Sequence, residues 1–232
     1  MSDTKEQQYN VVLDLVKKKG GATSMGLMAN YVWQYDPRRL VFLLARYKFV
    51  AKMLEGKDHV LEIGCADAFG TRIVQQAVGQ VVAVDFDPVF VEDVNARMDE
   101  DWQLSCFLHD MLTGRVEHKF QFDAAFSIDV LEHIQPKDEA TFIQNIVDSV
   151  HDEGMVIIGT PSIQSQPYAS EASKAGHVNC KDGQELKQLL QGWFHNVLLF
   201  SMNDELVHTG FHPLAHYLFV VCSVKLSKPL VD

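Results

Sequence analysis

The sequence of 232 residues lacks several features that mark particular classes of protein. It has no apolar run of about 18 residues, which a membrane-spanning helix needs. Its first residues, M-S-D-T-K-E-Q-Q, have no apolar centre of the kind found in signal peptides. Its four cysteines are scattered without C-x-x-C spacing, which disfavours both a disulfide framework and a zinc site. These absences predict a cytoplasmic protein with reduced thiols and no membrane partner.

Positive charge is scarce outside the N-terminal quarter of the chain. The sequence has 20 Lys and Arg against 31 Asp and Glu, which gives a net charge of −11. Residues 1–55 hold nine Lys and Arg against five Asp and Glu, a net charge of +4, so the remainder carries −15. An acidic body repels the phosphate backbone, so nucleic acid is disfavoured as a partner. The basic segment either faces an anionic small ligand or is a solvated helical face, and we favour the solvated face.

The hydrophobic pattern changes near residue 55. Residues 1–55 predict an N-terminal helical lid segment, with one helix ending at Gly20-Gly21 and another opening at Pro37. Over residues 56–232, short apolar strands alternate with helical patterns, which predicts a parallel sheet covered on both faces. The expected strands lie at about 59–63, 81–85, 104–108, 122–127, 154–159, 195–200 and 215–224. The predicted fold is α/β and Rossmann-like, with a seven-stranded, mostly parallel sheet, helices on both faces and the N-terminal helical lid.

Two later features complete the expected architecture. The strands at 195–200 and 215–224 are close enough in sequence to pair as an antiparallel edge. The polar stretch 162–181 is too long for an ordinary connection, so we predict that it is a functional loop or lid.

The most informative stretch is V-L-E-I-G-C-A-D-A-F-G at residues 60–70, followed by V-V-A-V-D at 81–85. Gly64 lets a ligand approach the backbone closely because it has no Cβ. The carboxylate of Asp85, at the end of the next strand, can hold two ribose hydroxyls. The interval from Glu62 to Asp85 corresponds to one strand–helix–strand unit. The pattern therefore predicts a site for a cofactor that contains a nucleoside.

Three kinds of ligand are compatible with such a site. A dinucleotide turn needs G-x-G-x-x-G, where this chain has Gly64, Ala66 and Phe69. A phosphate-binding P-loop needs G-K-[ST], and no such triplet follows Gly64. S-adenosylmethionine (SAM) needs a close backbone turn, an acidic residue for the ribose and an apolar slot for adenine. The sequence supplies these features more naturally than a phosphate cradle, so SAM is favoured.

The chain resembles class I SAM-dependent methyltransferases, near the ubiquinone-biosynthesis-like small-molecule group. The resemblance is good over residues 58–160 and loose over 161–224. In that family the first strand ends in [DE]-x-G-x-G, and here it reads Glu62-Ile63-Gly64-Cys65-Ala66. Ala66 stands where the family has its second glycine, so one methyl group has to fit beside the cofactor.

The resemblance implies a set of cofactor-binding residues. It implies that Gly64, Cys65 and Ala66 contact SAM through their backbone and that Glu62 supports the methionine amine. It also implies that Asp85 holds the ribose hydroxyls and Phe86 lies against the adenine.

The same resemblance extends to two later strand ends. It implies that Asp110, next to Met111, accepts a hydrogen bond from the adenine amino group. The segment F-S-I-D-V-L-E-H-I at 126–134 resembles the family's segment after the fourth strand, where Ile128 and Asp129 line the cofactor near the sulfonium.

Methyl transfer from a sulfonium is an in-line displacement, so the protein mainly aligns the acceptor and excludes water. An oxygen acceptor also needs a base, and histidine is suited to that role near neutral pH. His133 follows the fourth strand, at the edge where ligands bind in open α/β sheets. His177 lies in G-H-V-N, and similar runs recur in the resembled family. We predict His133 and His177 as catalytic residues, the alternative being capped or surface side chains.

Two places invite a metal site. Three histidines are spaced by four residues, His208, His212 and His216. Gly210 and Pro213 break the helix that would put them on one face. The Glu132-His133 pair could bind a divalent cation with a distant carboxylate. Neither pattern is specific, and the sequence predicts no metal.

Aromatic and cationic side chains precede the first strand, where class I enzymes often build a segment that covers the acceptor. They are Tyr31, Trp33, Arg38, Arg39, Arg46 and Tyr47. Arg46 is expected to pair with the SAM carboxylate or an anionic acceptor, or else to be a cation on the helix surface.

The predicted activity is SAM-dependent methyl transfer to an oxygen or nitrogen of a polar small molecule, such as a sugar or nucleotide-sugar. The alternatives are an NAD-dependent oxidoreductase and a non-catalytic SAM-binding scaffold. The oligomeric state is not predicted.

Overall fold

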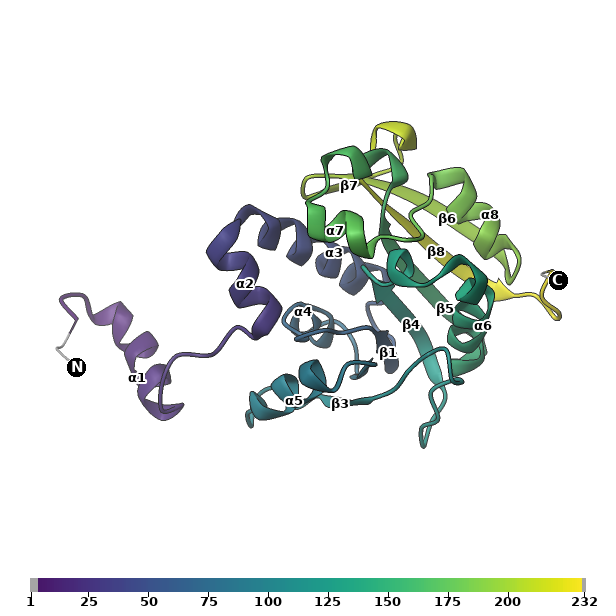
Figure 1. The fold of residues 1–232 in the computed structure, drawn as a ribbon. Coiled ribbons are helices and arrows are strands. Elements are labelled where there is room, and N and C mark those ends of the chain that lie inside the picture. Colours follow the sequence, from purple (N-terminus) through teal and green to yellow (C-terminus); the bar gives the residue numbers. More distant parts are fainter. Residues whose placement is uncertain (1–3, 231–232) are drawn as a thin grey trace.

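The computed structural model describes residues 4–230, and its centre is one eight-stranded sheet. The strands lie in the order β3-β2-β1-β4-β5-β8-β6-β7 (Figure 1). Neighbours from β3 to β5 pair in parallel, whereas β8 is antiparallel to both β5 and β6. The strands are β1 His59–Ile63, β2 Gln80–Asp85, β3 Ser105–Leu108, β4 Phe122–Ile128, β5 Val150–Pro161, β6 Phe194–Asn203, β7 Leu206–His208 and β8 Tyr217–Lys225.

The central strands are mostly apolar because both faces of the sheet are covered. In β1 every residue except His59 is buried, and in β4 every residue except Asp123 is buried. Strands buried on both faces show continuous apolar runs instead of alternation. The register sets Glu62 beside Ala83 of β2 and Phe126 of β4. The carboxyl ends of β1, β2 and β4 therefore meet at one edge.

Helices cover the sheet in two layers (Figure 1). The helices are η1 Gln7–Tyr9, α1 Asn10–Lys18, α2 Leu27–Tyr35, α3 Arg38–Met53, α4 Thr71–Gln75, α5 Pro88–Ala96, η2 Leu131–His133, η3 Pro136–Asp138, α6 Glu139–Ser149, η4 Ile163–Tyr168, α7 Glu171–Gly176, α8 Gly183–Gln191 and η5 His212–Leu214. One core cluster joins α6 and α8 to the sheet, with Phe142 and Leu186 fully buried. A second joins α3 and α4 to the sheet, with Val50 and Val74 fully buried.

The α/β architecture predicted from the sequence is confirmed, and the sheet has one strand more than expected. The additional strand is β7, which pairs with β6 after a turn at Asp204, where φ is +51°. A strand of three residues is too short to give a periodic signal. β6 and β8 pair antiparallel as expected, but β8 lies between β5 and β6.

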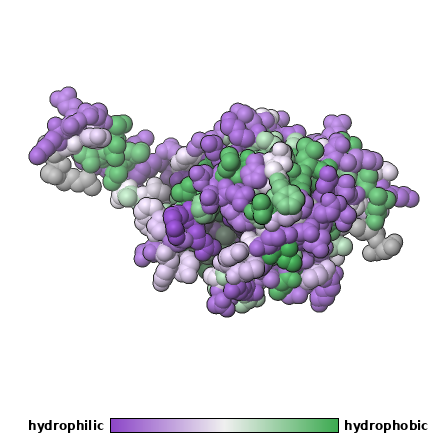
Figure 2. Space-filling view, turned by 90° about the horizontal axis from the view of Figure 1, so that it is seen from above, coloured by the Kyte–Doolittle hydropathy of each residue, from purple (hydrophilic) through white to green (hydrophobic). Residues whose placement is uncertain are grey.

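The N-terminal segment divides into an outlying part and a part that belongs to the core. α1 stands away from the body and exposes Val11, Val12 and Leu15 (Figure 1, Figure 2). α3 instead contributes Tyr47 and Val50 to the core. Closure of residues 1–55 as a lid stays a prediction, and residues 1–3 lie outside the described part of the chain.

The stretch predicted as a long functional loop, 162–181, contains η4 and α7. The side chain of Ser162 caps η4 and that of Ser170 caps α7, each by accepting a hydrogen bond from a backbone N–H. Capping therefore gives this stretch defined structure. Within residues 4–230, no helix combines the length and apolarity needed to span a membrane.

Candidate functional site

The turn after β1 can be built only with glycine at position 64. Its φ is +73°, a conformation that glycine adopts without strain. A Cβ at this position would lie 2.3 Å from Cγ2 of Val130, which belongs to the segment after β4. The Gly64 N–H donates to the carbonyl of Val84 at 2.8 Å. Gly64 therefore holds together the ends of β1, β2 and β4.

Ala66 and Ala68 continue this turn in a strained conformation. Their φ angles are +45° and +51°, and a left-handed conformation costs a residue with a Cβ about 1–2 kcal/mol. The backbone N–H of Ala66 donates to Oδ2 of Asp85 at 2.8 Å, which helps to fix the turn. Cys65 is buried, with 2% of its surface exposed. Its side chain is thus turned into the core, so the predicted contact with SAM would have to use its backbone.

Asp85 joins the turns that follow β1 and β2. Its Oδ2 accepts from Ala66, and its Oδ1 accepts from the backbone N–H of Asp87 at 2.9 Å. A carboxylate oxygen has two lone pairs, so each oxygen can accept one further hydrogen bond. Phe86, the next residue, is 72% exposed. An exposed aromatic ring lies beside a carboxylate whose oxygens can each accept another hydrogen bond, which is compatible with the predicted ribose and adenine contacts.

Glu62 is buried and bonded to two helices. Its Oε1 accepts from the Tyr47 hydroxyl at 2.8 Å, and its Oε2 accepts from Thr71 Oγ1 at 2.6 Å. Burial raises the pKa of Glu62 to about 7, although the two hydrogen bonds oppose the shift. The carboxylate therefore ties α3 and α4 to β1. Sequence reasoning missed this role, although Tyr47 was among the residues singled out before the first strand.

Asp110 and Met111, the predicted cofactor-binding residues after β3, differ in their exposure to solvent. Asp110 is exposed, and its Oδ1 accepts from the backbone N–H of Leu112 at 2.8 Å. Met111 is 4% exposed and belongs to the core that α6 and α8 cover. Its side chain is therefore packed away from any ligand at this edge, which leaves only its backbone for the predicted contact. The two neighbours cannot play similar roles.

The end of β4 has a second strained turn. Asp129 has φ +58°, and its Oδ2 lies 2.6 Å from Nη1 of Arg46 on α3. Arg46 also stacks on the ring of Tyr217, 3.8 Å from the ring centroid. Its side chain is only 16% exposed, so the surface-cation alternative for Arg46 is wrong. Ile128 is 5% exposed, so a contact through its side chain is limited.

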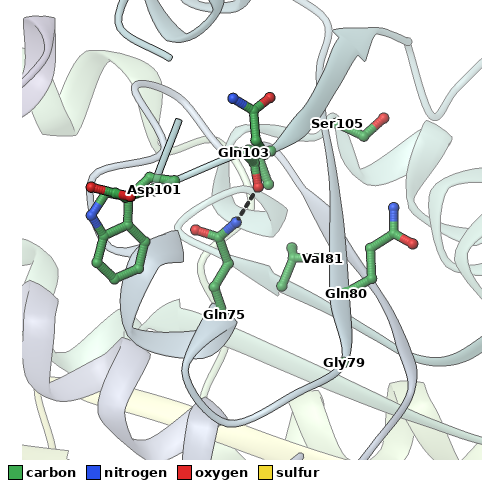
Figure 3. Close-up of a pocket in the computed structure, with 9 residues that line it drawn as sticks. Gln75, Gly79, Gln80, Val81, Asp101, Gln103 and Ser105 are labelled. Atoms are coloured by element: carbon green, nitrogen blue, oxygen red, sulfur yellow. Dashed lines mark hydrogen bonds between the residues drawn. The ribbon is translucent and has the colours of Figure 1, made fainter. Parts of the chain in front are cut away.

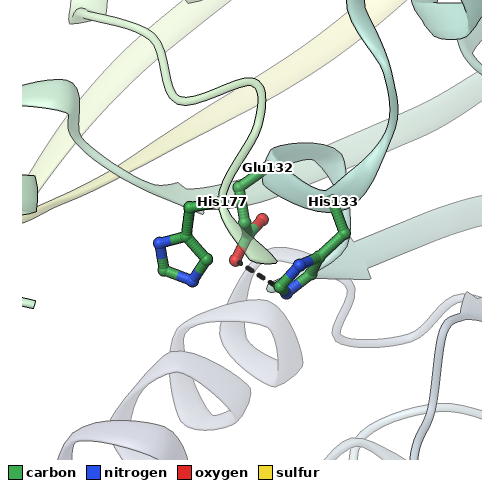
Figure 4. Close-up of side chains that lie close together, drawn as sticks. All are labelled: Glu132, His133 and His177. Atoms are coloured by element: carbon green, nitrogen blue, oxygen red, sulfur yellow. Dashed lines mark ion pairs between the residues drawn. The ribbon is translucent and has the colours of Figure 1, made fainter. Parts of the chain in front are cut away.

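The two predicted catalytic histidines lie side by side. The rings of His133 and His177 are 5.2 Å apart between centroids, and Glu132 lies against both (Figure 4). Burial lowers the pKa of His177, so its imidazole stays neutral to lower pH than usual. Burial and the neighbouring Asp129 raise the pKa of Glu132 to about 8. The fold thus brings together residues from η2 and from the end of α7.

Each histidine is held by a hydrogen bond at Nδ1. His133 Nδ1 lies 2.9 Å from the carbonyl of Gly176, and His177 Nδ1 lies 2.8 Å from Oε1 of Gln166. Because both partners are acceptors, each Nδ1 carries the proton and each Nε2 keeps its lone pair. Gln166 was missed as a positioning residue, although it lies in the stretch predicted as a functional loop. Both imidazoles can accept a proton or bind a cation through Nε2.

The histidines considered as a helical metal face do not assemble. His208 ends β7 and bonds Asn203 through Nε2 at 2.9 Å, while His212 begins η5. Gly210 lies between them, as the sequence argument required. Within residues 4–230, the one group of histidine, cysteine and acidic side chains with metal-binding proximity is Glu132 with His133 and His177.

A cavity of about 500 Å³ lies at the opposite edge of the sheet (Figure 3). It is lined by Gln80 and Ser105, the first residues of β2 and β3, and by Gln75 and Trp102. Ligands of open α/β sheets bind beyond the carboxyl ends of the strands. This cavity is therefore separate from the predicted cofactor site.

Comparisons with known proteins agree with this geometry. Residues 60–154 match a family described as a methyltransferase domain. A probable SAM-dependent methyltransferase of Mycobacterium tuberculosis (strain ATCC 25618 / H37Rv) is 25% identical over 145 residues, which cover 62% of this chain and 50% of the relative. A probable SAM-dependent methyltransferase of Mycolicibacterium smegmatis is 25% identical over 62% of this chain and 54% of its own length. The chain thus spans about half the length of the curated relatives it matches.

Solved structures share the fold at low sequence identity. The methyltransferase domain of bacterial CtHen1-C has a TM-score of 0.65 at 15% identity, over 80% of this chain and 100% of that one. The DhpI-SAM-HEP complex has a TM-score of 0.61 at 15% identity, and the match covers 95% of this chain and 99% of that chain. N-methyltransferase NodS from Bradyrhizobium japonicum WM9, in complex with S-adenosylhomocysteine, has a TM-score of 0.57 at 17% identity. The match covers 83% of this chain and 91% of that chain.

The fold, the matched domain and the relatives lead to one assignment. The strand order places a glycine turn and an acidic strand end at the carboxyl edge, where this fold binds its nucleoside cofactor. Residues 60–154 form a methyltransferase domain similar to that of SAM-dependent methyltransferases, whose cofactor is S-adenosylmethionine.

Proposed function

We propose that the chain transfers the methyl group of SAM to an oxygen or nitrogen of a polar small molecule. The observation that carries the proposal is the pair of imidazoles at the carboxyl edge, each held through Nδ1 so that its Nε2 keeps a lone pair. His133 lies on the same segment as Asp129 and Val130, and Val130 lies against the turn at Gly64. A cofactor bound at that turn would present its sulfonium near polar side chains able to bind an acceptor.

The cofactor would be held mainly by backbone and by carboxylates. Gly64, Cys65 and Ala66 would contact the methionine part, with Glu62 supporting its amine. Asp85 would accept from the ribose hydroxyls. Phe86 and Asp110 would face the adenine, beside the backbone of Met111, and Ile128 and Asp129 would approach the sulfonium.

The chemical step needs little from the protein beyond alignment and a proton acceptor. A lone pair on the acceptor atom attacks the methyl carbon in line with the carbon–sulfur bond, and the electrons of that bond pass to sulfur. A hydroxyl acceptor loses its proton to Nε2 of His133 or His177. Since burial lowers the pKa of His177, its neutral form is present at physiological pH.

A polar acceptor is supported by the surroundings of the two histidines. Asp129 and Arg46 form an ion pair in this region, and Glu132 is a buried carboxyl group beside the two histidines. The buried hydroxyl of Tyr217 and the buried Nε of Arg46 have no partner among the described residues. A hydroxylated or anionic acceptor, such as a sugar or nucleotide-sugar, would satisfy such groups. A cytoplasmic location remains part of the proposal, since the four cysteines are all free.

Two experiments separate this function from its rivals. Calorimetric titration with SAM and with NAD should give binding for SAM alone, and binding of NAD alone would favour an oxidoreductase. Incubation with labelled SAM and a metabolite extract should give a labelled small molecule. If SAM binds but no product appears, the chain is a SAM-binding scaffold instead of an enzyme.

A further inference from the structure

We infer that Glu132, His133 and His177 form a binding site for a divalent cation, and that the bound cation contacts the methyl acceptor. Their ligand atoms lie within 4.8 Å of one another, although the residues come from η2 and the end of α7 (Figure 4). This inference revises the expectation from sequence that the chain holds no metal. Its catalytic part rests on the proposed function, whereas the binding of the cation does not.

The tautomers of the two histidines carry the argument. Each Nδ1 donates to an oxygen, of Gly176 in one case and of Gln166 in the other. Metal-binding histidines commonly donate their second ring N–H to a carbonyl or carboxylate, which fixes the ring and directs the free lone pair. A single catalytic base would need only one such imidazole. Here two are oriented in this way beside the same carboxylate.

Glu132 supplies a buried carboxyl group that would give up its proton to bind a cation. It is 1% exposed, and among the described side chains its carboxylate accepts a hydrogen bond only from Thr160, at 3.2 Å. The nearby guanidinium of Arg46 already pairs with Asp129. Ionising this carboxyl group is costly without a close ionic partner, and a bound cation would be such a partner. Its Oε1 lies 4.0 Å from Nε2 of His133, which leaves space for a shared ligand between them.

The backbone holds the three side chains in a rigid frame. The N–H groups of Val178 and Asn179 both donate to the carbonyl of Glu132, at 2.8 and 3.0 Å. The side chain of Asn179 donates to Glu139 at 2.6 Å, and Glu139 is neutralised by Lys181 at 2.7 Å. The segment bearing His177 is therefore fastened directly to η2. Such support keeps a ligand set preorganised.

The ligand types select the class of cation. Two imidazole nitrogens and one carboxylate suit Zn²⁺, Mn²⁺, Fe²⁺ or Co²⁺ better than Ca²⁺, which prefers oxygen ligands. Ligand bonds of about 2.1 Å set neighbouring ligand atoms about 3.4 Å apart in tetrahedral geometry. Binding would therefore draw these ligand atoms together by up to about 1.4 Å, which side-chain rotations can supply.

Three protein ligands leave coordination positions open for an acceptor oxygen. A cation polarises a bound hydroxyl and lowers its pKa, so the proton leaves to solvent before the oxygen attacks the methyl carbon. In the loaded enzyme the histidines then act as ligands, and no imidazole needs to take the proton. An acceptor with a hydroxyl group is the chemical class that such a site would favour.

The binding test uses the full chain after removal of metals by a chelator and dialysis. Titration with Co²⁺ or Mn²⁺ should show one equivalent bound, with a Co²⁺ absorption spectrum of nitrogen and oxygen ligation. His133→Gln and His177→Gln should each weaken binding at least tenfold. His195→Gln is the matched control because His195 is an exposed histidine on β6, and its affinity should be unchanged. Retained SAM binding and an unchanged melting temperature show that a variant is folded.

The outcomes separate the cation site from the proposed function. Absence of stoichiometric binding, or equal affinity in both histidine variants and the control, overturns the site. Turnover that falls after chelation and returns with Mn²⁺ supports the catalytic role, and undiminished turnover overturns it. If the cation binds but no methyl transfer occurs with any extract, the proposed function fails while the site stands.

Discussion

The turn after β1 and the segment around His133 lie at the same edge of the sheet but are assembled differently. The first is encoded by eleven consecutive residues and closed by Asp85, one strand away. The second needs η2, the end of α7 and α3 to meet. A local motif can be recognised in a sequence because its residues are neighbours. The His133 region becomes visible only once the chain is folded, and it is also the part that would define the acceptor.

The largest expected effect is on turnover, and it tests only the His133 region, where the acceptor is proposed to bind. His133→Ala and His177→Ala should each lower kcat by about 10²–10⁴-fold at equal SAM occupancy, because a base or ligand is lost. Single-turnover kinetics with saturating SAM measures this, and His195→Ala is the control. Since the neutral imidazole is the active form and burial lowers the pKa of His177, activity should fall only below pH 6.5. Unchanged kcat in both variants would make the two histidines structural.

Gly64→Ala should disrupt the turn after β1, where the cofactor is proposed to bind. The added Cβ would lie 2.3 Å from Val130, and the alanine would have to adopt φ +73°. We therefore expect a loss of about 3 kcal/mol in the free energy of unfolding. Gly20→Ala separates the two causes, because Gly20 has φ +71° and nothing within 4 Å of its Cβ position. Chemical denaturation should show a loss of about 1 kcal/mol there. Equal losses at both positions would remove the role assigned to Val130.

Glu62 should make stability depend on pH. Its folded-state pKa of about 7 lies above the ordinary value of 4.5, so the folded protein holds the proton more tightly than the unfolded chain. Stability is therefore greatest below pH 4.5 as far as this group is concerned, and falls by about 3 kcal/mol as the pH rises to 7. Glu62→Gln should flatten this part of the curve in urea denaturation measured between pH 4.5 and 7.5. A parallel curve for the variant would contradict the shift.

Asp85→Ala should weaken SAM binding at least tenfold, which calorimetry measures directly. The change removes the predicted ribose contact and the hydrogen bond that holds Ala66. Asp87→Ala is a matched control, since Asp87 caps α5 by accepting from Val89 and should cost about 1 kcal/mol of stability without affecting SAM. Equal SAM affinity in the two variants would refute the ribose contact.

The smallest expected effect concerns the alanine that departs from the family pattern. Ala66→Gly should relieve the strain of φ +45° and stabilise the protein by at most about 1 kcal/mol. The gain is limited because glycine also increases the freedom of the unfolded chain. Thermal melting measures the change, and a lower melting temperature would mean that the methyl group of Ala66 packs favourably.

Much of the fold could be predicted because its signals are local. Strands such as β1 and β4 are short and mostly apolar, and α5 and α8 begin at capping aspartates. The position of β8 between β5 and β6 could not be predicted, because strand order depends on long-range packing. β7 was missed because three residues carry no periodicity.

The candidate site shows the same division. Gly64 could be singled out as a turn glycine, and Asp85 because the interval from Glu62 to Asp85 matches one strand–helix–strand unit. The bond from Tyr47 to Glu62 could not, since a helix side chain reaches a strand only after the core forms. The supports of the histidines, Gln166 and Gly176, are likewise set by tertiary contacts. The cofactor contacts themselves stay predictions.

The contact between Val130 and Gly64 has a thermodynamic consequence. It joins the turn that would carry the cofactor to the segment that would carry the acceptor, so neither can shift without displacing the other. Two ligands that bind to mechanically joined segments are linked, and linkage is reciprocal. If bound SAM raises the affinity for the acceptor by some factor, bound acceptor must raise the affinity for SAM by the same factor. Val130→Ala should reduce both factors equally.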